Sequence, residues 1–355
     1  IFYLNLYKDN YIDKNRIYTL TKKINENLHF KFGIKNLYHR MIFTAAALVS
    51  ERYGADLNGI KNRGYEVFRN VIRDTIQKSL EDNKKQNMKL DILMEVYIDI
   101  KMNIVENKEA INDFIDCVIE ISDSVNSDNW NGEDVMGIFF NEFNRYKKKS
   151  ESGQVFTPDH ITSLMYKILE VNANDKILDA ACGSGAFLVK SMSNMIKEVG
   201  GINTKEAKKI KEHSLFGIEF DREIFALACA NMMIHKDGKT NLEQLDSRDK
   251  EASEWIKSKG ITKVLMNPPF ERKYGCKKIV ENVLNSVPSG IKCAFIMPEK
   301  KMEKDKMGKL LEKHHLEAII KLPEKLFDAG VTTSIYVFET GKKQVGEIYG
   351  CYIED

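Results

Sequence analysis

The first 150 residues alternate apolar and polar positions with the period of an α-helix. In residues 37–53, apolar side chains recur three and four positions apart and would form one broad helical face. Gly54 follows at a position where helices commonly end. Patterns of the same period cover residues 65–80, 88–105, 110–121 and 135–146, and the segment contains no proline. Residues 1–150 are therefore predicted to form a mainly α-helical N-terminal domain.

The pattern changes near residue 150, where short apolar runs begin to alternate with amphipathic segments. The runs are expected to be strands and cover residues 177–178, 214–218, 241–245, 263–266, 293–297, 316–322 and 333–338. Amphipathic helices are expected over residues 186–197 and 222–235. Strands that alternate with helices indicate an α/β fold with a parallel, doubly wound sheet. Residues 151–355 are therefore predicted to form a second domain around a seven-stranded sheet.

Two helix starts can also be read from the sequence. Thr157 is predicted to cap a helix whose first residue is Pro158, because this pair is common at helix N-termini. Asp221 is predicted to cap the helix that begins at residue 222.

The composition is that of an ordinary globular protein. The chain has 355 residues, of which 43% are apolar and 30% charged. No uncharged apolar run is long enough to cross a membrane, and the N-terminus lacks a signal peptide, so we expect a cytoplasmic protein without a membrane partner. Six scattered cysteines show no zinc spacing, so we expect no metal site. The sequence begins with Ile1 rather than methionine, which is typical of a fragment.

The most informative segment is Asn267-Pro268-Pro269-Phe270. It follows the apolar run 264–266 and precedes a polar stretch, as expected where a buried strand opens into a loop. Two prolines stiffen the backbone and remove two N–H donors. The loop therefore offers carbonyl oxygens, one side-chain amide and one aromatic face, which suit a planar ring that carries an amino group. An ordinary turn at the end of a strand is the alternative.

Acidic residues are expected at the ends of the first three strands. Asp179 precedes a turn with Gly183 and Gly185, which would let a ligand approach the backbone closely. Neither a GxGxxG pattern nor a phosphate loop is present, and the acid would repel a pyrophosphate. Glu219 is placed to accept ribose hydroxyls. Asp246 could accept from an adenine amino group or be only a turn residue. Together these residues favour S-adenosylmethionine (SAM) over NAD.

Three segments, taken in order, resemble a known family. Residues 153–158, residues 179–187 and the segment Asn267 to Phe270 are similar to the motifs of gamma-class N6-adenine DNA methyltransferases. The order resembles most the modification (M) subunit of type I restriction–modification systems. The resemblance implies a Rossmann-like, SAM-dependent methyltransferase fold behind a helical domain.

The resemblance also implies a role for each matching residue. Phe156, Thr157 and Pro158 would contact the methionine end of SAM. Asp179, Cys182, Gly183 and Gly185 would line the cofactor loop, Glu219 would hold the ribose, and Asp246 would meet the adenine of SAM. The target adenine would be flipped out of the duplex and held by Asn267, Pro268, Pro269 and Phe270.

The expected partners are double-stranded DNA, a separate specificity (S) subunit and a restriction (R) subunit. Two alternatives stay open. The first is a protein glutamine-N5 methyltransferase, which also has a helical N-terminal part and an Asn-Pro-Pro motif. The second is a catalytically silent scaffold, which would bind DNA or a protein partner without methylating it. The triplet Glu281-Asn282-Val283 matches a motif of cytosine-C5 methyltransferases, but the chain has no Pro-Cys dipeptide, so we interpret the triplet as a chance match.

Overall fold

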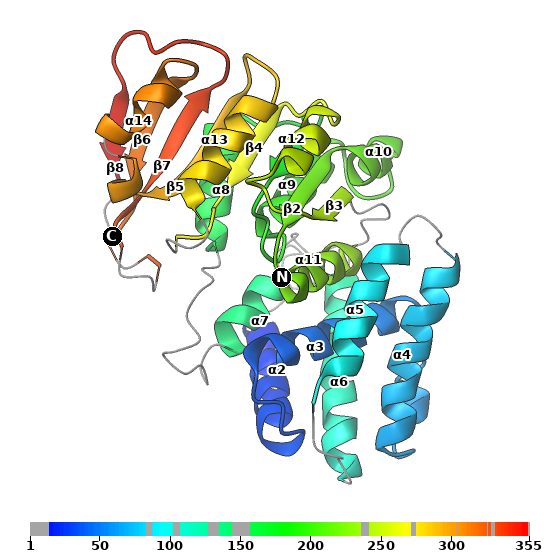
Figure 1. Ribbon diagram of the computed structural model, residues 1–355. Helices are drawn as coiled ribbons and strands as arrows, with labels where there is room; N and C mark the ends of the chain where they lie inside the picture. The colour runs from blue at the N-terminus through cyan, green and yellow to red at the C-terminus, as the bar shows by residue number, and fades with distance from the viewer. Residues whose placement is uncertain are drawn as a thin grey trace, which may run out of the picture. The chain divides into compact units, whose positions relative to one another are not determined.

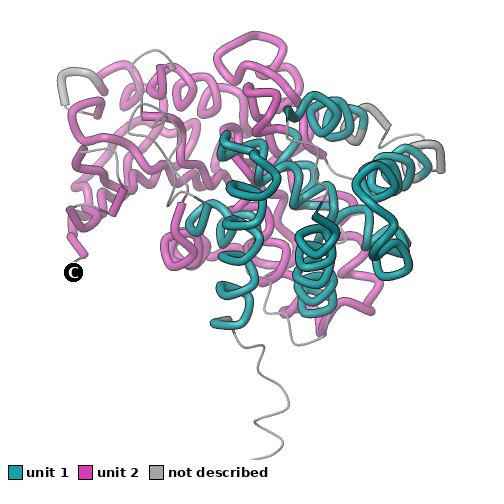
Figure 2. The backbone as a smooth tube through the Cα atoms, turned by 90° about the horizontal axis from the view of Figure 1, so that it is seen from below, with its two compact units in different colours: residues 1–147, 226–239 teal, residues 148–225, 240–355 magenta. Residues whose placement is uncertain are grey.

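The computed structural model describes residues 14–82, 87–101, 107–126, 135–143, 157–235, 241–270, 275–302, 304–324, 326–327 and 331–353. The chain forms two compact units, which Figure 2 shows in separate colours. The first unit comprises residues 1–147 with residues 226–239, and the second comprises residues 148–225 with residues 240–355. Each unit is described separately below.

The described part of the first unit is helical (Figure 1). Its helices before residue 148 are α2 (Lys14–Glu26), the π-helical turn η1 (Asn27–Lys31), α3 (Leu37–Arg52), the 3-10 turn η2 (Asn58–Ile60), α4 (Tyr65–Asp82), α5 (Asn87–Asp99), α6 (Lys108–Asn126) and α7 (Val135–Phe143). All helices predicted from the apolar period in this segment are present. Helix α5 ends at Asp99, earlier than the predicted end at residue 105, and residues 102–106 lie outside the described residues.

Helix α3 is the centre of this unit. Twelve of its sixteen residues are buried, and it contacts α4, α5, α6 and α7. Its Phe43 ring packs against aromatic rings from neighbouring segments, with centroids 5.4–6.0 Å apart, namely Phe32, Phe68, Tyr97 and Phe114. Gly54, with φ near +92°, follows the helix, and its N–H donates to the carbonyl of Glu51. The predicted helix end is therefore confirmed.

The second unit is built on an eight-stranded sheet. The strands are β1 (Ile177–Asp179), β2 (Leu215–Glu219), β3 (Asn241–Gln244), β4 (Lys263–Met266), β5 (Lys292–Pro298), β6 (His315–Lys321), β7 (Thr333–Glu339) and β8 (Tyr349–Tyr352). Their order is β3-β2-β1-β4-β5-β7-β6-β8. The first five strands pair in parallel, whereas β7 runs antiparallel to both β5 and β6. The sheet is therefore mixed and mostly parallel, which corrects the prediction of a parallel sheet. The seven predicted strands are all present, and β8 adds an eighth, parallel to β6 at the edge.

Helices cover both faces of this sheet. The helices are α8 (Asp159–Ile168), α9 (Ala186–Glu198), α10 (Lys205–His213), α12 (Lys250–Lys257), α13 (Cys276–Ser286) and α14 (Lys304–Leu311), with a 3-10 turn η6 (Glu299–Lys301). Helix α11 (Arg222–Ile234) follows β2 in the sequence. Helices α12, α13 and α14 share one apolar core with alternate residues of the central strands, and α12 and α13 lie in front of the sheet in Figure 1. Helix α9 packs on β1 and β2. From Ala226 onward, α11 groups with the first unit.

One predicted helix start is wrong, and another is confirmed. Helix α8 begins at Asp159 with Pro158 as its cap residue, so Thr157 is not the N-cap and Pro158 is not the first helical residue. The Pro158 ψ of 144° is extended, which explains why the helix starts one position later. Asp221 does cap α11, because its Oδ1 accepts from the N–H groups of Glu223 and Ile224 at 3.0 and 3.1 Å.

Candidate active site

Three neighbouring strands carry polar side chains at one edge of the sheet. Asp179 is the last residue of β1, Glu219 is the last residue of β2, and Asn267 follows β4 directly. Since β1 lies between β2 and β4 and runs parallel to both, these three strand ends meet. The strand order also reverses at β1 and β4, which is where open α/β sheets bind ligands.

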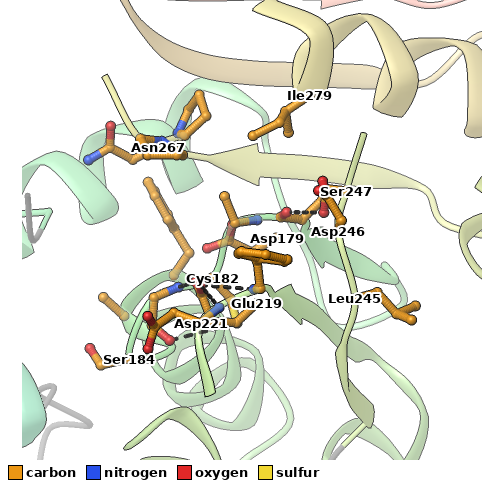
Figure 3. Close-up of a pocket in the computed structure, with 18 of the residues that line it drawn as sticks. Asp179, Cys182, Ser184, Glu219, Asp221, Leu245, Asp246, Ser247, Asn267 and Ile279 are labelled. Atoms are coloured by element: carbon orange, nitrogen blue, oxygen red, sulfur yellow. Dashed lines mark hydrogen bonds between the residues drawn. The ribbon is translucent and has the colours of Figure 1, made fainter. Parts of the chain in front are cut away.

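A cavity lies at this edge (Figure 3). The predicted site residues that line it are Thr157, Asp179, Cys182, Gly183, Glu219, Asp246, Asn267, Pro268 and Pro269. Pro158, Gly185 and Phe270 are not among its lining residues within the described chain. Phe156 lies outside the described residues.

Asp179 is a buried carboxyl, with an exposed fraction of 1%. Its Oδ1 accepts from the N–H of Ala181 at 3.1 Å. Burial raises the pKa of Asp179 well above its usual value; the Ala181 N–H opposes this effect, and the nearby Glu219 adds to it. A ligand with an amine or another cationic group would favour the ionised form of this carboxyl.

Glu219 is held by main-chain amides. Its Oε2 accepts from the N–H of Gly183 at 3.0 Å, and its Oε1 accepts from the N–H groups of Phe220 and Asp221, both at 2.9 Å. Burial raises the pKa of Glu219, while the hydrogen bonds from Asp221 and Gly183 act in the opposite direction. The bond to Gly183, whose φ is +55°, fixes the glycine turn after β1 against the end of β2. A carboxylate has about four acceptor positions, so the carboxylate keeps room for a further donor.

Asp246 has a different environment. It follows β3 by two residues, and its carboxylate pairs with the Arg248 guanidinium, with Nε at 2.8 Å from Oδ1 and Nη2 on Oδ2. The N–H of Arg248 also donates to Oδ1, at 2.9 Å. These hydrogen bonds from Arg248 lower the pKa of Asp246, so its carboxylate stays ionised over a wide pH range. The role of Asp246 toward adenine stays a prediction, and any such contact would be made by a carboxylate that is already paired.

Asn267 is the amide of the Asn-Pro-Pro-Phe loop. Its Nδ2 donates to Oγ1 of Thr157 at 3.0 Å. Its Oδ1 is buried and has no hydrogen-bond partner among the described residues. A buried acceptor without a donor is costly, which makes this atom a candidate to receive a ligand N–H.

The comparisons with known proteins show which family the site segment resembles. Residues 131–291 match the family model described as N-6 DNA Methylase, and this segment contains the glycine turn, Glu219 and the Asn-Pro-Pro-Phe loop. Over these residues, which make up less than half of the chain, the sequence is similar to the N-6 DNA methylase family. The resemblance inferred from the motifs is thereby confirmed.

Relatives of the methylase segment occur in several restriction systems. The chain is 33% identical over 240 residues to the "Type II restriction enzyme and methyltransferase RM.BcgI" of Heyndrickxia coagulans, an alignment that covers 63% of this chain and 37% of that protein. It is 22% identical over 215 residues to the "Type I restriction enzyme EcoEI methylase subunit" of Escherichia coli, covering 54% of this chain and 43% of that subunit. The chain thus spans less than half the length of these relatives.

The fold of the methylase has solved counterparts. A chain from a structural study of the assembly of the type I R-M system superposes with a TM-score of 0.66 at 15% identity. The superposition covers 96% of this chain and 76% of the other. At this identity the similarity supports the fold, and the α/β methyltransferase architecture predicted from the sequence is confirmed.

Phe270, the last residue of the Asn-Pro-Pro-Phe loop, has an aromatic neighbour. Its ring lies edge-to-face against Phe327, with centroids 5.6 Å apart and planes at 77°. Phe327 is buried and comes from the segment between β6 and β7. The sequence reasoning did not single out Phe327, because its apolar neighbours did not distinguish it from an ordinary core residue.

Several cavity residues were also not predicted. Phe220 lies between two acids at the end of β2, lines the cavity and is 57% exposed, although a large apolar side chain is usually buried. Leu245 and Ile279 add apolar surface to the wall, and Arg248 adds a cation. An apolar residue directly after a strand-end acid was the available signal for Phe220. The Asp246–Arg248 spacing was the signal for Arg248.

Asn282, from the triplet interpreted as a chance match, makes hydrogen bonds that support the wall of the cavity. Its Nδ2 donates to the carbonyls of Ser247 and Asp249 at 2.9 and 3.2 Å. Its Oδ1 accepts from the Ser253 hydroxyl at 2.7 Å. Ser247 in turn donates from its hydroxyl to the carbonyl of Ala180. These bonds tie α13 to the loop after β3, and that loop to the turn after β1.

Within the described residues, no group of three or more His, Cys, Asp or Glu side chains could hold a metal ion. No helix in the described part of the chain is long and apolar enough to cross a membrane.

Proposed function

We propose that this chain transfers a methyl group from SAM to the N6 of an adenine in DNA, as the modification subunit of a type I-like restriction–modification system. The observation that carries the proposal is Asn267. Its amide oxygen is buried and has no hydrogen-bond partner among the described residues, and Asn267 lines the same cavity as the strand-end carboxyls Asp179 and Glu219. The cavity lies in the segment that matches the N-6 DNA methylase model.

The cavity residues fit SAM. The buried Asp179 would favour the amino group of its methionine end, and Glu219 has room for a ribose hydroxyl. Phe220, exposed on the cavity, offers an aromatic face for a purine ring. When bound, SAM supplies an electrophilic methyl group on a sulfonium, a leaving group that needs no metal or covalent nucleophile.

The Asn-Pro-Pro-Phe loop fits the target amino group. The lone pair of adenine N6 is delocalised into the ring, which makes the nitrogen a poor nucleophile. Asn267 Oδ1 and the Pro268 carbonyl would each accept one N6 hydrogen and shift charge onto the nitrogen. Phe270 would stack on the base, an interaction worth roughly 1–3 kcal/mol. Adenine must leave the duplex to reach these groups, so base flipping belongs to the proposal.

The proposed partners follow from the relatives. The Escherichia coli relative is named as the methylase subunit of a type I restriction enzyme, and the Heyndrickxia coagulans relative as a combined restriction enzyme and methyltransferase. We therefore propose double-stranded DNA as substrate, with a specificity subunit and a restriction subunit as partners. The family match favours this function over glutamine-N5 methylation and over a silent scaffold.

Two variants test the proposed site. Glu219→Ala should raise the SAM dissociation constant by about tenfold or more, because hydrogen bonds to a carboxylate are lost. Phe270→Ala should leave that constant unchanged but weaken capture of the base. Calorimetry measures SAM binding, and the fluorescence of 2-aminopurine at the target position reports the flipped base. An unchanged SAM constant in Glu219→Ala, or equal loss of both functions in Phe270→Ala, would show that the site is misassigned.

A further inference from the structure

Two site residues that are 110 positions apart in the sequence are joined by a hydrogen bond. Asn267 Nδ2 donates to Thr157 Oγ1 at 3.0 Å. Thr157 lies just before α8, and Asn267 lies just after β4. The family resemblance implies different partners for the two residues, the methionine end of SAM for Thr157 and the target base for Asn267. The structure connects them to each other.

The bond matters because a carboxamide has two different ends. The torsion that turns the Asn267 amide is nearly two-fold, so oxygen and nitrogen can exchange places at small cost. In the observed orientation the nitrogen donates to Thr157, and the oxygen is left as a buried acceptor without a partner among the described residues. In the reversed orientation the Thr157 hydroxyl would have to donate to the amide oxygen, and an NH2 group would stand at the buried position. That NH2 group would present a donor to the amino group of the base, which is also a donor.

We propose that Thr157 is a positioning residue for the methyl-transfer step. Its hydroxyl oxygen accepts from Asn267 Nδ2 and so stabilises the amide in the orientation that turns Oδ1 toward the amino group of the target base. This inference rests on the proposed function, since it requires an amino-bearing base at Asn267. It goes further by giving Thr157 a role in the rate of transfer that is separate from cofactor affinity.

The step in which the orientation counts can be written in full. The N6 lone pair forms a bond to the methyl carbon while the bond from that carbon to sulfur breaks. The electron pair of the broken bond stays on sulfur, which gives S-adenosylhomocysteine, and one N6 proton passes to solvent. An acceptor on the N6 hydrogens favours this change because positive charge develops on the nitrogen.

The test compares Thr157→Val, which keeps the shape but removes the hydroxyl, with Thr157→Ser, which keeps the hydroxyl. The protein is purified as its native complex through a tag on this chain. The methyl acceptor is genomic DNA from a strain that lacks the gene. Two quantities are measured, the SAM dissociation constant by calorimetry and the single-turnover rate of N6-methyladenine formation at saturating SAM.

Thr157→Val should lower the single-turnover rate about tenfold, as expected for loss of one neutral hydrogen bond in the transition state, and should change the SAM constant less than about threefold. Thr157→Ser should restore the rate to within about threefold of the unmodified protein. The matched control is Thr162→Val. Thr162 is also buried and donates to the carbonyl of Asp159, but it is not among the residues that line the cavity. This control should change neither quantity.

Repeating Thr157→Val in an Asn267→Asp protein separates the effect on the orientation of the Asn267 amide from any other effect of Thr157. In Asn267→Asp the side chain carries an acceptor at both ends, so there is no orientation left to set. Thr157→Val should then cost less than about threefold in rate, in contrast to about tenfold in the unmodified background.

Three outcomes would overturn the inference. In the first, Thr157→Val loses SAM affinity but keeps the rate at saturating SAM. In the second, Thr157→Ser is as slow as Thr157→Val, and in the third, Thr157→Val lowers the rate by the same factor in the Asn267→Asp protein as in the unmodified protein. These outcomes differ from failure of the proposed function, in which the unmodified complex itself would form no N6-methyladenine.

Discussion

At the scale of single residues, the cavity holds carboxyls of two kinds. Asp179 is buried and Glu219 is partly buried, and removal from water raises the pKa of each. Asp246 is paired with Arg248, which lowers its pKa. The ionised forms of Asp179 and Glu219 are therefore disfavoured until a ligand with donors or positive charge binds. The ionised form of Asp246 is already stabilised by Arg248. We expect ligand binding to depend on pH mainly through Asp179 and Glu219.

Asp179→Asn tests the cost of the buried charge. The folded-state pKa of Asp179 lies above the value of about 3.9 expected in the unfolded chain, so the folded state binds the proton more tightly. Its contribution to stability is complete below about pH 4 and is lost as pH rises through the raised pKa. The ligand-free variant should therefore melt at a higher temperature than the unmodified protein, by a margin that grows with pH, while its SAM affinity falls. Calorimetric melting between pH 4 and 9 measures the margin, and a margin that stays constant or shrinks as pH rises would contradict the assignment.

The sequence predicted the strand-end residues of the site better than the contacts between them. Asp179, Glu219 and Asn267 could be found because a residue directly after an apolar run lies at the edge of a parallel sheet. The Asp246–Arg248 pair, the Phe270–Phe327 contact and the Thr157–Asn267 bond depend on the directions of side chains. Those directions are set by packing between distant segments, which the local pattern does not contain.

At the scale of elements, the loops around the cavity are braced by side chains outside it. Asn282 on α13 donates to two main-chain carbonyls of the loop after β3. In that loop the Ser247 hydroxyl donates to the carbonyl of Ala180, in the turn after β1. The cavity wall is therefore positioned by a helix that follows the Asn-Pro-Pro-Phe loop in sequence. Local pattern predicted the helix but not this function of its asparagine.

Asn282→Ala tests this bracing. Loss of the two donated bonds should loosen the loop that carries Asp246 and raise the SAM dissociation constant about three- to tenfold, with little change in the rate at saturating SAM. Asn285→Ala is the matched control, because Asn285 lies on the same helix and donates to the carbonyl of Glu281 within that helix. Calorimetry on both variants should separate them; equal affinities in the two would argue that Asn282 has no part in shaping the cavity.

The edge of the sheet shows where element prediction failed. Strand β8 was not predicted because residues 349–352 include a glycine and are mostly exposed, so no alternation of buried and exposed positions marks them.

The start of α8 was predicted one residue early because Thr-Pro is a good helix-start pattern in isolation. In the structure the Thr157 hydroxyl accepts from Asn267 across the unit instead of capping a helix.

At the scale of the whole molecule, the chain combines a helical unit with a methyltransferase sheet. The change in the apolar pattern near residue 150 predicted two domains, and the second compact unit begins at Lys148. The assignment of residues 226–239 to the first unit could not be read from the sequence, because an amphipathic helix after β2 is equally compatible with packing in either unit. The family match, residues 131–291, includes residues from both units.

The central claim is that Asn267 directs methyl transfer to adenine N6. Methylation-aware sequencing of the host genome tests it most directly, in strains that carry the unmodified gene, the Asn267→Ala allele or a deletion. We predict N6-methyladenine at a defined sequence motif in the first strain and its loss, at equal protein abundance, in the other two. The same N6-methyladenine pattern in the unmodified and Asn267→Ala strains, or no methylated motif that depends on the gene, would contradict the claim.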